Sequence, residues 1–131
     1  MDVVDIEFVG PSGAVKASAT VEIADTPETR RIGLSKRASL GRDRGMFFDT
    51  AGCYWMKDVE FPLDLAFLSK SGEVLEVQHM PVDRDGLFHY SPAAENAVKA
   101  AHALEMPMGW FGGHGVTRGD VMTCREAGCD G

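Results

Sequence analysis

The stretch LDLAFLSKSGEVLEV, residues 63–77, contains two apolar runs separated by a short polar segment with one glycine. Runs of this length, rich in Leu, Val and Phe and bounded by turn residues, are typical of β-strands. A connection of three to five residues that contains glycine is typical of a hairpin. We therefore predict antiparallel strands at 63–68 and 74–77, with a sheet built around them.

A second hairpin is predicted near the N-terminus. Residues 15–23 alternate between apolar and polar side chains, so one face of this strand should lie in the core. The partly alternating residues 3–8 precede it, and the turn Gly10-Pro11-Ser12-Gly13 separates the two segments. Further on, Thr26-Pro27-Glu28 combines an N-cap, a first-turn proline and a first-turn acid, which predicts a short helix ending at Gly33.

The remaining segments complete a strand-rich pattern. We predict extended segments at 46–48, 54–56 and 121–123, an irregular loop at 81–94 and a helical turn at 108–115. The alanines of residues 96–103 favour a helix, whereas their position between two breaks favours a strand, and both alternatives stay open. The fold class is α+β: a compact strand-rich domain with a small curved or barrel-like sheet and two short helices.

Length and composition predict one globular domain. The 131 residues are 44% hydrophobic and 25% charged, and we assign residues 1–131 to a single domain, with a C-terminal tail at 123–131. Apolar runs are far shorter than the roughly 20 residues that cross a bilayer, and residues 1–5 do not resemble a signal peptide. We expect a cytoplasmic protein that does not enter the membrane.

The charge balance argues against nucleic acid and anionic membranes as partners. Thirteen basic and 20 acidic residues give a net charge of −7. Residues 28–44 reverse this trend, with six basic and two acidic side chains, so this segment is a solvated surface, a contact for an acidic partner, or a self-contact with the acidic remainder of the protein. Its basic residues are Arg30, Arg31, Lys36, Arg37, Arg42 and Arg44.

No metal site or cofactor is predicted. The three cysteines, Cys53, Cys124 and Cys129, form no C-x-x-C pair, and the four histidines are scattered without ligand-like spacing. An odd number of cysteines without a signal peptide favours reduced thiols, so we expect all three to be free. The short spacing of Cys124 and Cys129 would allow a small-loop disulfide under oxidising conditions.

The segment Tyr54-Trp55-Met56-Lys57 is the densest in candidate site residues. Asp64 follows shortly after and interrupts an apolar run, and a carboxylate drawn toward a core needs a cation or N–H donors. Lys57 or Arg37 could supply the charge, either in a ligand or catalytic cleft or in a purely structural pair. We also expect Trp55 to share a core with Phe67. The candidate binding residues are Trp55, Lys57, Asp64, Arg37 and Tyr90.

No complete catalytic constellation is apparent, so no catalytic residue is assigned. The G-x-S-x-G and P-loop signatures are missing from the sequence. Cys53 is a nucleophile candidate with His79 or His114 as its base, but a lone cysteine is more often a small apolar side chain. Asp64 with Lys57 is the other candidate for a hydrolase-like activity.

Several motifs together resemble the bacterial and archaeal domain-of-unknown-function family 192, over about residues 21–122. They are residues 24–34, Gly45-Met46-Phe47-Phe48, Trp55-Met56-Lys57, Pro62-Leu63-Asp64-Leu65, Leu104-Glu105-Met106-Pro107, Gly109-Trp110-Phe111 and Gly119-Asp120. The resemblance implies a compact α+β fold and no assigned activity. Asp58 stands where an asparagine is frequent in the family, and because the family also occurs in viral genomes, the resemblance adds a virion protein as an alternative.

The leading functional hypothesis is a small non-enzymatic domain. It would bind a ligand or a protein partner through a cleft around Trp55, Lys57 and Asp64. The alternatives are a structural or virion assembly protein, and a hydrolase-like enzyme that uses Asp64 with Lys57, or Cys53.

Overall fold

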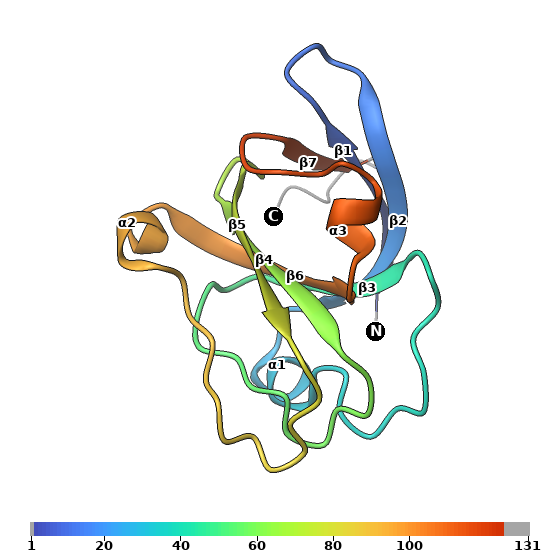
Figure 1. Cartoon of the computed structure of the whole chain (residues 1–131), viewed down its shortest axis with the longest axis vertical. Helices are drawn as coiled ribbons and strands as arrows, with labels where there is room; N and C mark the ends of the chain where they lie inside the picture. The colour runs from blue at the N-terminus through green and yellow to red at the C-terminus, as the bar shows by residue number, and fades with distance from the viewer. Residues whose placement is uncertain (1, 125–131) are drawn as a thin grey trace.

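The computed structural model describes residues 2–124, and the hairpin predicted near the N-terminus is present. Strand β1 (Val3–Val9) pairs antiparallel with β2 (Val15–Ala24). Alternate residues of β2, from Ala17 to Val21, are buried against Ile6 and Phe8 of β1, as the period-two pattern predicts. Figure 1 shows this hairpin projecting from one end of the molecule.

The second predicted hairpin is also present, in a sheet to which the described residues contribute seven strands. Strands β4 (Leu63–Ser69) and β5 (Val74–Met80) pair antiparallel. The order across the sheet is β5-β4-β6-β3-β2-β1-β7, with β3 at Arg44–Phe48, β6 at Ala100–Pro107 and β7 at Val121–Cys124. Among the strand pairs of the described residues, β2 with β3 is the one parallel pair.

The sheet is curved and open. Its edge strands β5 and β7 share no ladder, and an isolated bridge between Glu73 and Val121 connects the two edges. The α+β class is therefore confirmed, but the predicted barrel-like closure is not, because the sheet order does not close on itself.

The structure shows which parts of residues 96–103 are helix and which are strand, a choice that the sequence did not decide. Residues 96–103 contain the end of a short helix, α2 (Ala94–Ala97), followed by the first half of β6. The strand pairs with β3 on one side and β4 on the other, and these ladders override the helix preference of the alanines. The extended segment predicted at 54–56 is reduced to a single bridge between Tyr54 and Tyr90.

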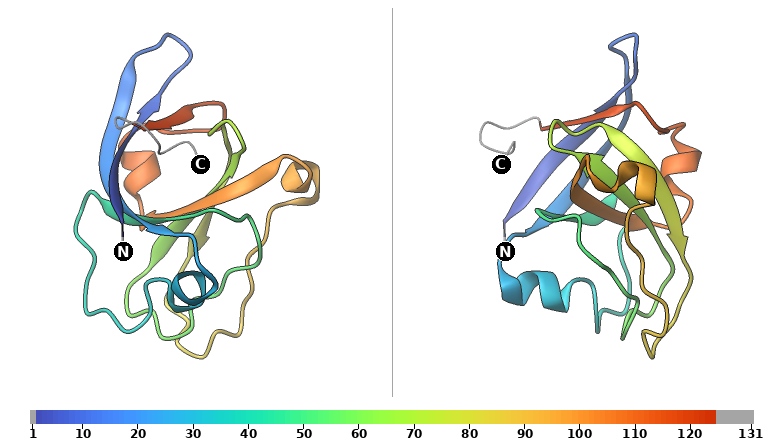
Figure 2. Two further views of the ribbon diagram at one scale, coloured as in Figure 1. Left: turned by 180° about the vertical axis from the view of Figure 1, so that it is seen from behind. Right: turned by 90° about the vertical axis from the view of Figure 1, so that its left-hand side faces the viewer.

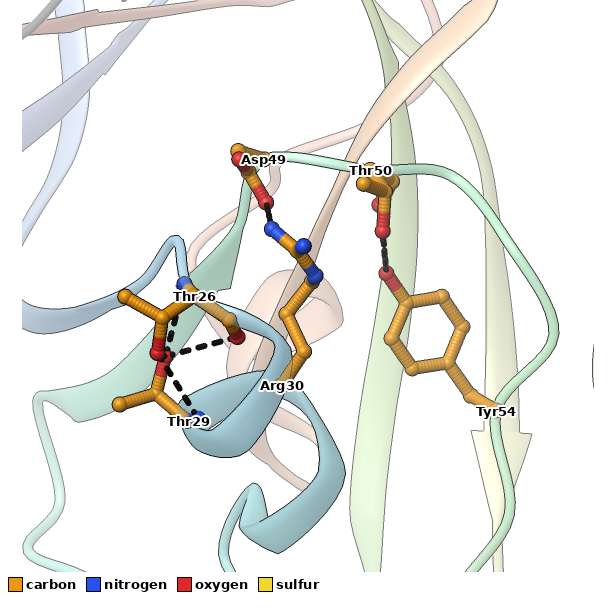
Figure 3. A network of polar contacts seen from close by, with 6 residues as sticks. All are labelled: Thr26, Thr29, Arg30, Asp49, Thr50 and Tyr54. Carbon is orange, nitrogen blue, oxygen red and sulfur yellow. Dashed lines mark hydrogen bonds and ion pairs between the residues drawn. The ribbon is translucent and has the colours of Figure 1, made fainter.

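Within residues 2–124, three short helices accompany the sheet, one more than predicted. The helix α1 (Pro27–Ile32) begins at Thr26, whose hydroxyl accepts a hydrogen bond from the Thr29 N–H in a capping box (Figure 3), and its C-cap is Gly33 as expected. The helix α3 (Trp110–Gly113) packs Trp110 and Phe111 against Phe8.

Two apolar clusters cover the two faces of the sheet. The first contains the β1–β2 hairpin and α3, together with Leu104 and Met106 of β6. The second contains Leu63, Leu65 and Phe67 of β4, and Ala103 of β6. Helix α1 and the loops at 49–62 and 81–93 gather at the end of the molecule opposite the N-terminal hairpin (Figures 1 and 2), and the cavities described next lie among them.

Candidate functional site

Two adjoining cavities lie between α1 and the loop at 49–62. We call them the inner cavity, of about 200 Å³, and the outer cavity, of about 490 Å³. The two share four lining residues, Arg31, Ile32, Trp55 and Lys57. The inner cavity extends toward the sheet and reaches Glu105 of β6, whereas the outer cavity extends along residues 31–36 and 55–58.

Trp55 stands between the two cavities and is not part of the core. Its side chain is 45% exposed, whereas Phe67, Leu63 and Leu65 are completely buried, so the predicted shared core of Trp55 and Phe67 is wrong. The chain near Gly86 supports the indole ring: a Cβ at that glycine would lie 3.0 Å from the ring and 2.8 Å from the Lys57 Cβ. The ring is thus held in place while part of its surface stays accessible.

Replacing Trp55 with alanine should therefore cost little stability. A half-exposed side chain loses much less on truncation than a core tryptophan, so we expect a fall of about 1 kcal/mol in the free energy of unfolding. Urea denaturation of the Trp55→Ala variant measures it. The matched control is Trp110→Ala, because Trp110 is 4% exposed and should cost several times more. Equal losses in the two variants would contradict this placement.

Three cations border the outer cavity without an ion pair to any described residue: Arg31, Lys36 and Lys57. Lys57 places its ammonium 5.3 Å from the centroid of the Trp55 ring, within the range of a cation–π contact. One acid, Asp58, also borders this cavity. The outer cavity therefore carries a positive local charge on a protein whose net charge is −7.

Two other basic residues of segment 28–44, Arg30 and Arg37, form ion pairs with acidic side chains. Arg30 forms an ion pair with Asp49 at 2.7 Å, which ties α1 to the residue after β3 (Figure 3). Arg37 forms a two-pronged pair with Glu22, and the Arg37 hydrogen bond holds the pKa of that carboxyl below its usual value. Arg37 lies in a separate surface depression with Arg44, so it is not beside Trp55.

Backbone strain is concentrated at the outer cavity. Among the described residues other than glycine, only Lys36 and Asp58 have a positive φ, of 63° and 62°. The two residues are joined by a hydrogen bond of 2.8 Å from the Lys36 N–H to the Asp58 carbonyl. Left-handed conformations are unfavourable for lysine, and such strain clusters at functional sites.

Glu105 is the functional candidate that the sequence did not single out. Its side chain lines the inner cavity and is 4% exposed, and no described group forms a hydrogen bond or ion pair with it. Burial raises the pKa of its carboxyl to about 8, so the group is mostly protonated at neutral pH. A buried carboxyl without a partner is unusual, because such groups are normally paired.

The sequence contains a signal for Glu105 that resembles the one for Asp64. Each acid interrupts an apolar run, Ala103 to Met106 in the case of Glu105. Because the sequence did not decide between helix and strand for residues 96–103, it could not predict which face of the element Glu105 would lie on. The strand β6 places it opposite Leu65 of β4 and Met46 of β3, on the face of the second apolar cluster.

Tyr54 and Cys53 complete the walls of the inner cavity. The Tyr54 hydroxyl donates a hydrogen bond to the Thr50 carbonyl at 2.5 Å (Figure 3), and burial raises the pKa of Tyr54 to about 12. Cys53 is exposed, and its Sγ lies 3.6 Å from Nδ1 of His89, a histidine that the sequence did not pair with it. The His89 ring in turn makes an edge-to-face contact with Trp55.

The cysteines do not all follow the expectation of free thiols. Cys53 is free, but Cys124 is disulfide-bonded, so the expectation is wrong for Cys124. Cys129 and most of the tail predicted at 123–131 lie outside the described residues.

Asp64 is buried, but in a different place from Lys57. Its Oδ1 lies 2.5 Å from Nδ1 of His79, and its Oδ2 accepts a hydrogen bond of 2.9 Å from the Gly109 N–H. It borders neither the inner nor the outer cavity, but a separate shallow one with Arg118. The predicted pairing of Asp64 with Lys57 is therefore wrong, and the histidine next to it in the sheet register, His79, takes that role.

Tyr90 contributes to the site only indirectly. Its backbone pairs with that of Tyr54, through hydrogen bonds of 2.8 and 2.7 Å, and its half-buried side chain packs on the second apolar cluster. It lines neither cavity. It holds the loop at 81–93 against the loop at 49–62.

Residues 2–124 contain no cluster of three or more metal-ligating side chains. Within the same residues, no helix has the length and apolar character needed to cross a membrane.

A small α+β domain with a cation-lined double cavity is thus defined by the fold and the site. The chain belongs to the domain-of-unknown-function family 192, described as "Uncharacterized ACR", which it matches over residues 9–124. A comparison with curated proteins gave no significant match.

Two solved structures show the same fold. A crystal structure of a candidate transcription regulator from Sinorhizobium meliloti is 26% identical, with a TM-score of 0.81 and coverage of 94% of each chain. A protein of unknown function from Novosphingobium aromaticivorans is 24% identical, with a TM-score of 0.76, and the match covers 92% of this chain and 84% of that one.

Proposed function

We propose that this protein is a binding domain for a small anion that carries a planar apolar group. The observation behind this proposal is the outer cavity, which the half-exposed Trp55 lines together with three cations that have no ion pair to any described residue. An anionic group would sit between Arg31 and Lys36, and the planar group would lie against the indole ring. This revises the hypothesis of a cleft at Trp55, Lys57 and Asp64 by removing Asp64.

The local charge supports an anionic ligand rather than a cationic one. Arg31, Lys36 and Lys57 together outweigh Asp58 around the outer cavity. The protonated carboxyl of Glu105 adds no negative charge at neutral pH, and it can donate a hydrogen bond to a ligand that reaches the inner cavity. Cations held close to an aromatic face recognise planar anions by combining charge with stacking.

The relative from S. meliloti is described as a candidate transcription regulator. A domain that binds a small molecule would suit a regulator that senses a ligand. The net charge of −7 does not favour direct contact of this chain with nucleic acid.

Binding can be tested by titrating the protein with phenyl phosphate, which joins a planar ring to a phosphate. In a Trp110→Phe background Trp55 is the one remaining tryptophan, so quenching of its fluorescence reports on the outer cavity. We expect saturable quenching, and an affinity about fivefold lower in the Lys36→Gln variant, since one surface charge contributes about 1 kcal/mol.

Three controls separate this result from general effects. Phenol carries only the ring and inorganic phosphate only the anion, so both should bind more weakly than phenyl phosphate. Lys70→Gln removes an exposed lysine from the β4–β5 turn and should leave the affinity unchanged. Equal binding of phenol and phenyl phosphate, or equal affinity of the Lys36→Gln variant and the starting protein, would refute the proposal.

A further inference from the structure

Cys53 lies at the wall of the inner cavity, where three features that favour thiol chemistry meet. The thiol is exposed and free, and the His89 Nδ1 is 3.6 Å from its sulfur. Arg31 and Lys57, which form no ion pair with a described residue, line the same cavity. A histidine in contact with the sulfur and cations lining the same cavity are surroundings in which cysteines act as nucleophiles.

Glu105 provides separate evidence that the inner cavity receives a molecule. The residue is only 4% exposed, its side chain has no hydrogen-bond or ion-pair partner among the described residues, and it lines a cavity of about 200 Å³. A group that entered this cavity and carried a hydrogen-bond acceptor would satisfy it. The same cavity thus offers a polar group without a partner at its inner end and a thiol at its wall.

We infer that the inner cavity is a thiol-modification site, where Cys53 reacts with small anionic disulfides to form a mixed disulfide. The geometry selects the class of reagent: the cations attract a negative group, and the cavity volume favours a short molecule. Cys53 is positioned for this reaction by His89, whose ring is in turn held by its edge-to-face contact with Trp55.

The reaction is a simple thiol–disulfide exchange. His89 accepts the Cys53 proton, and the thiolate attacks one sulfur of the disulfide. A new bond forms between the Cys53 sulfur and that half of the reagent while the original sulfur–sulfur bond breaks. The other half leaves as a thiolate and takes the proton back from His89, so one thiol is consumed and one is released.

The test uses three disulfides of similar length and different charge: dithiodipropionate, a dianion; 2-hydroxyethyl disulfide, which is neutral; and cystamine, a dication. Mass spectrometry of the intact protein follows the rate at which Cys53 gains one half of each reagent. In the folded protein we expect dithiodipropionate to react at least tenfold faster than cystamine. In denaturant this preference should disappear, because the cations no longer surround the thiol.

Single substitutions then test the role of each side chain in the site. Arg31→Gln should reduce the preference for dithiodipropionate, His89→Gln should slow all three reagents about tenfold, and Lys70→Gln, far from the cavity, should change nothing. Glu105→Leu should slow dithiodipropionate and leave cystamine unaffected. A folded protein that shows no preference among the three disulfides, or a His89→Gln variant that reacts at the original rate, would overturn the inference.

The measurement requires no other ligand in the outer cavity. Its failure is therefore distinguishable from a failure of phenyl phosphate to bind.

Discussion

Replacing Glu105 with glutamine is expected to stabilise the protein by about 3 kcal/mol at pH 7. Burial raises the pKa of this carboxyl from 4.5 to about 8, so the folded protein keeps a proton that the unfolded chain releases. Between pH 4.5 and about pH 8 the chain must therefore bind a proton at Glu105 when it folds. The free energy of unfolding falls by about 1.4 kcal/mol for each pH unit in this range. Glutamine has nearly the same shape and stays neutral, so it avoids this loss.

The sign and the pH range make this prediction specific. The contribution of Glu105 to stability is fully present below pH 4.5 and is lost as the pH rises through the folded pKa. The difference between the Glu105→Gln variant and the original protein should therefore be near zero at pH 4 and largest at pH 8 and above. Urea denaturation across this range measures it, with Glu95→Gln, an exposed acid, as the control. A variant less stable than the original protein at pH 8 would show that an unseen partner stabilises the carboxylate.

The second large effect is expected at Asp64, with the opposite sign. An Asp64→Asn variant should lose about 3 kcal/mol of unfolding free energy, because both carboxylate oxygens accept hydrogen bonds and asparagine retains only one acceptor. Either His79 or the backbone N–H of Gly109, the N-cap of α3, then loses its partner. Thermal denaturation followed by circular dichroism measures this loss of stability.

The partners of Asp64 can be separated by a second variant. The side chain of His79 is 72% exposed, so His79→Ala should cost less than Asp64→Asn, about 1 kcal/mol, because water replaces the lost contact. A melting temperature of Asp64→Asn equal to or above that of the original protein would show that Asp64 is held at a cost to the fold. Asp64 would then join the functional candidates.

Local patterns predicted much of the fold from the sequence. The alternation in residues 15–23, the polar turn between residues 68 and 74, and the cap at Thr26 all depend on near neighbours in the chain, and the structure confirms each of them. Residues 96–103 depended on distant partners instead. Their strand exists because β3 and β4 offer hydrogen-bonding edges on both sides, which no local preference reveals.

The candidate site was predicted in part. Trp55 and Lys57 contact each other because they are neighbours on the same loop, which the sequence alone reveals. Asp64 was assigned to the same cleft because an acid in an apolar run needs a partner, but the sequence could not tell which of several basic side chains would meet it. Sheet register decided in favour of His79, and the same register placed Glu105 at the inner cavity.

The central position of β6 has a consequence for biosynthesis. The ribosome makes the strands on both sides of β6 first, so β3 with the N-terminal hairpin and the β4–β5 pair exist before the strand that joins them. Until residues 100–107 are translated, each half presents an unpaired apolar edge, a feature that promotes aggregation and recognition by chaperones. The strand that contributes Glu105 is therefore also the one that covers the exposed edges of β3 and β4 in the nascent chain.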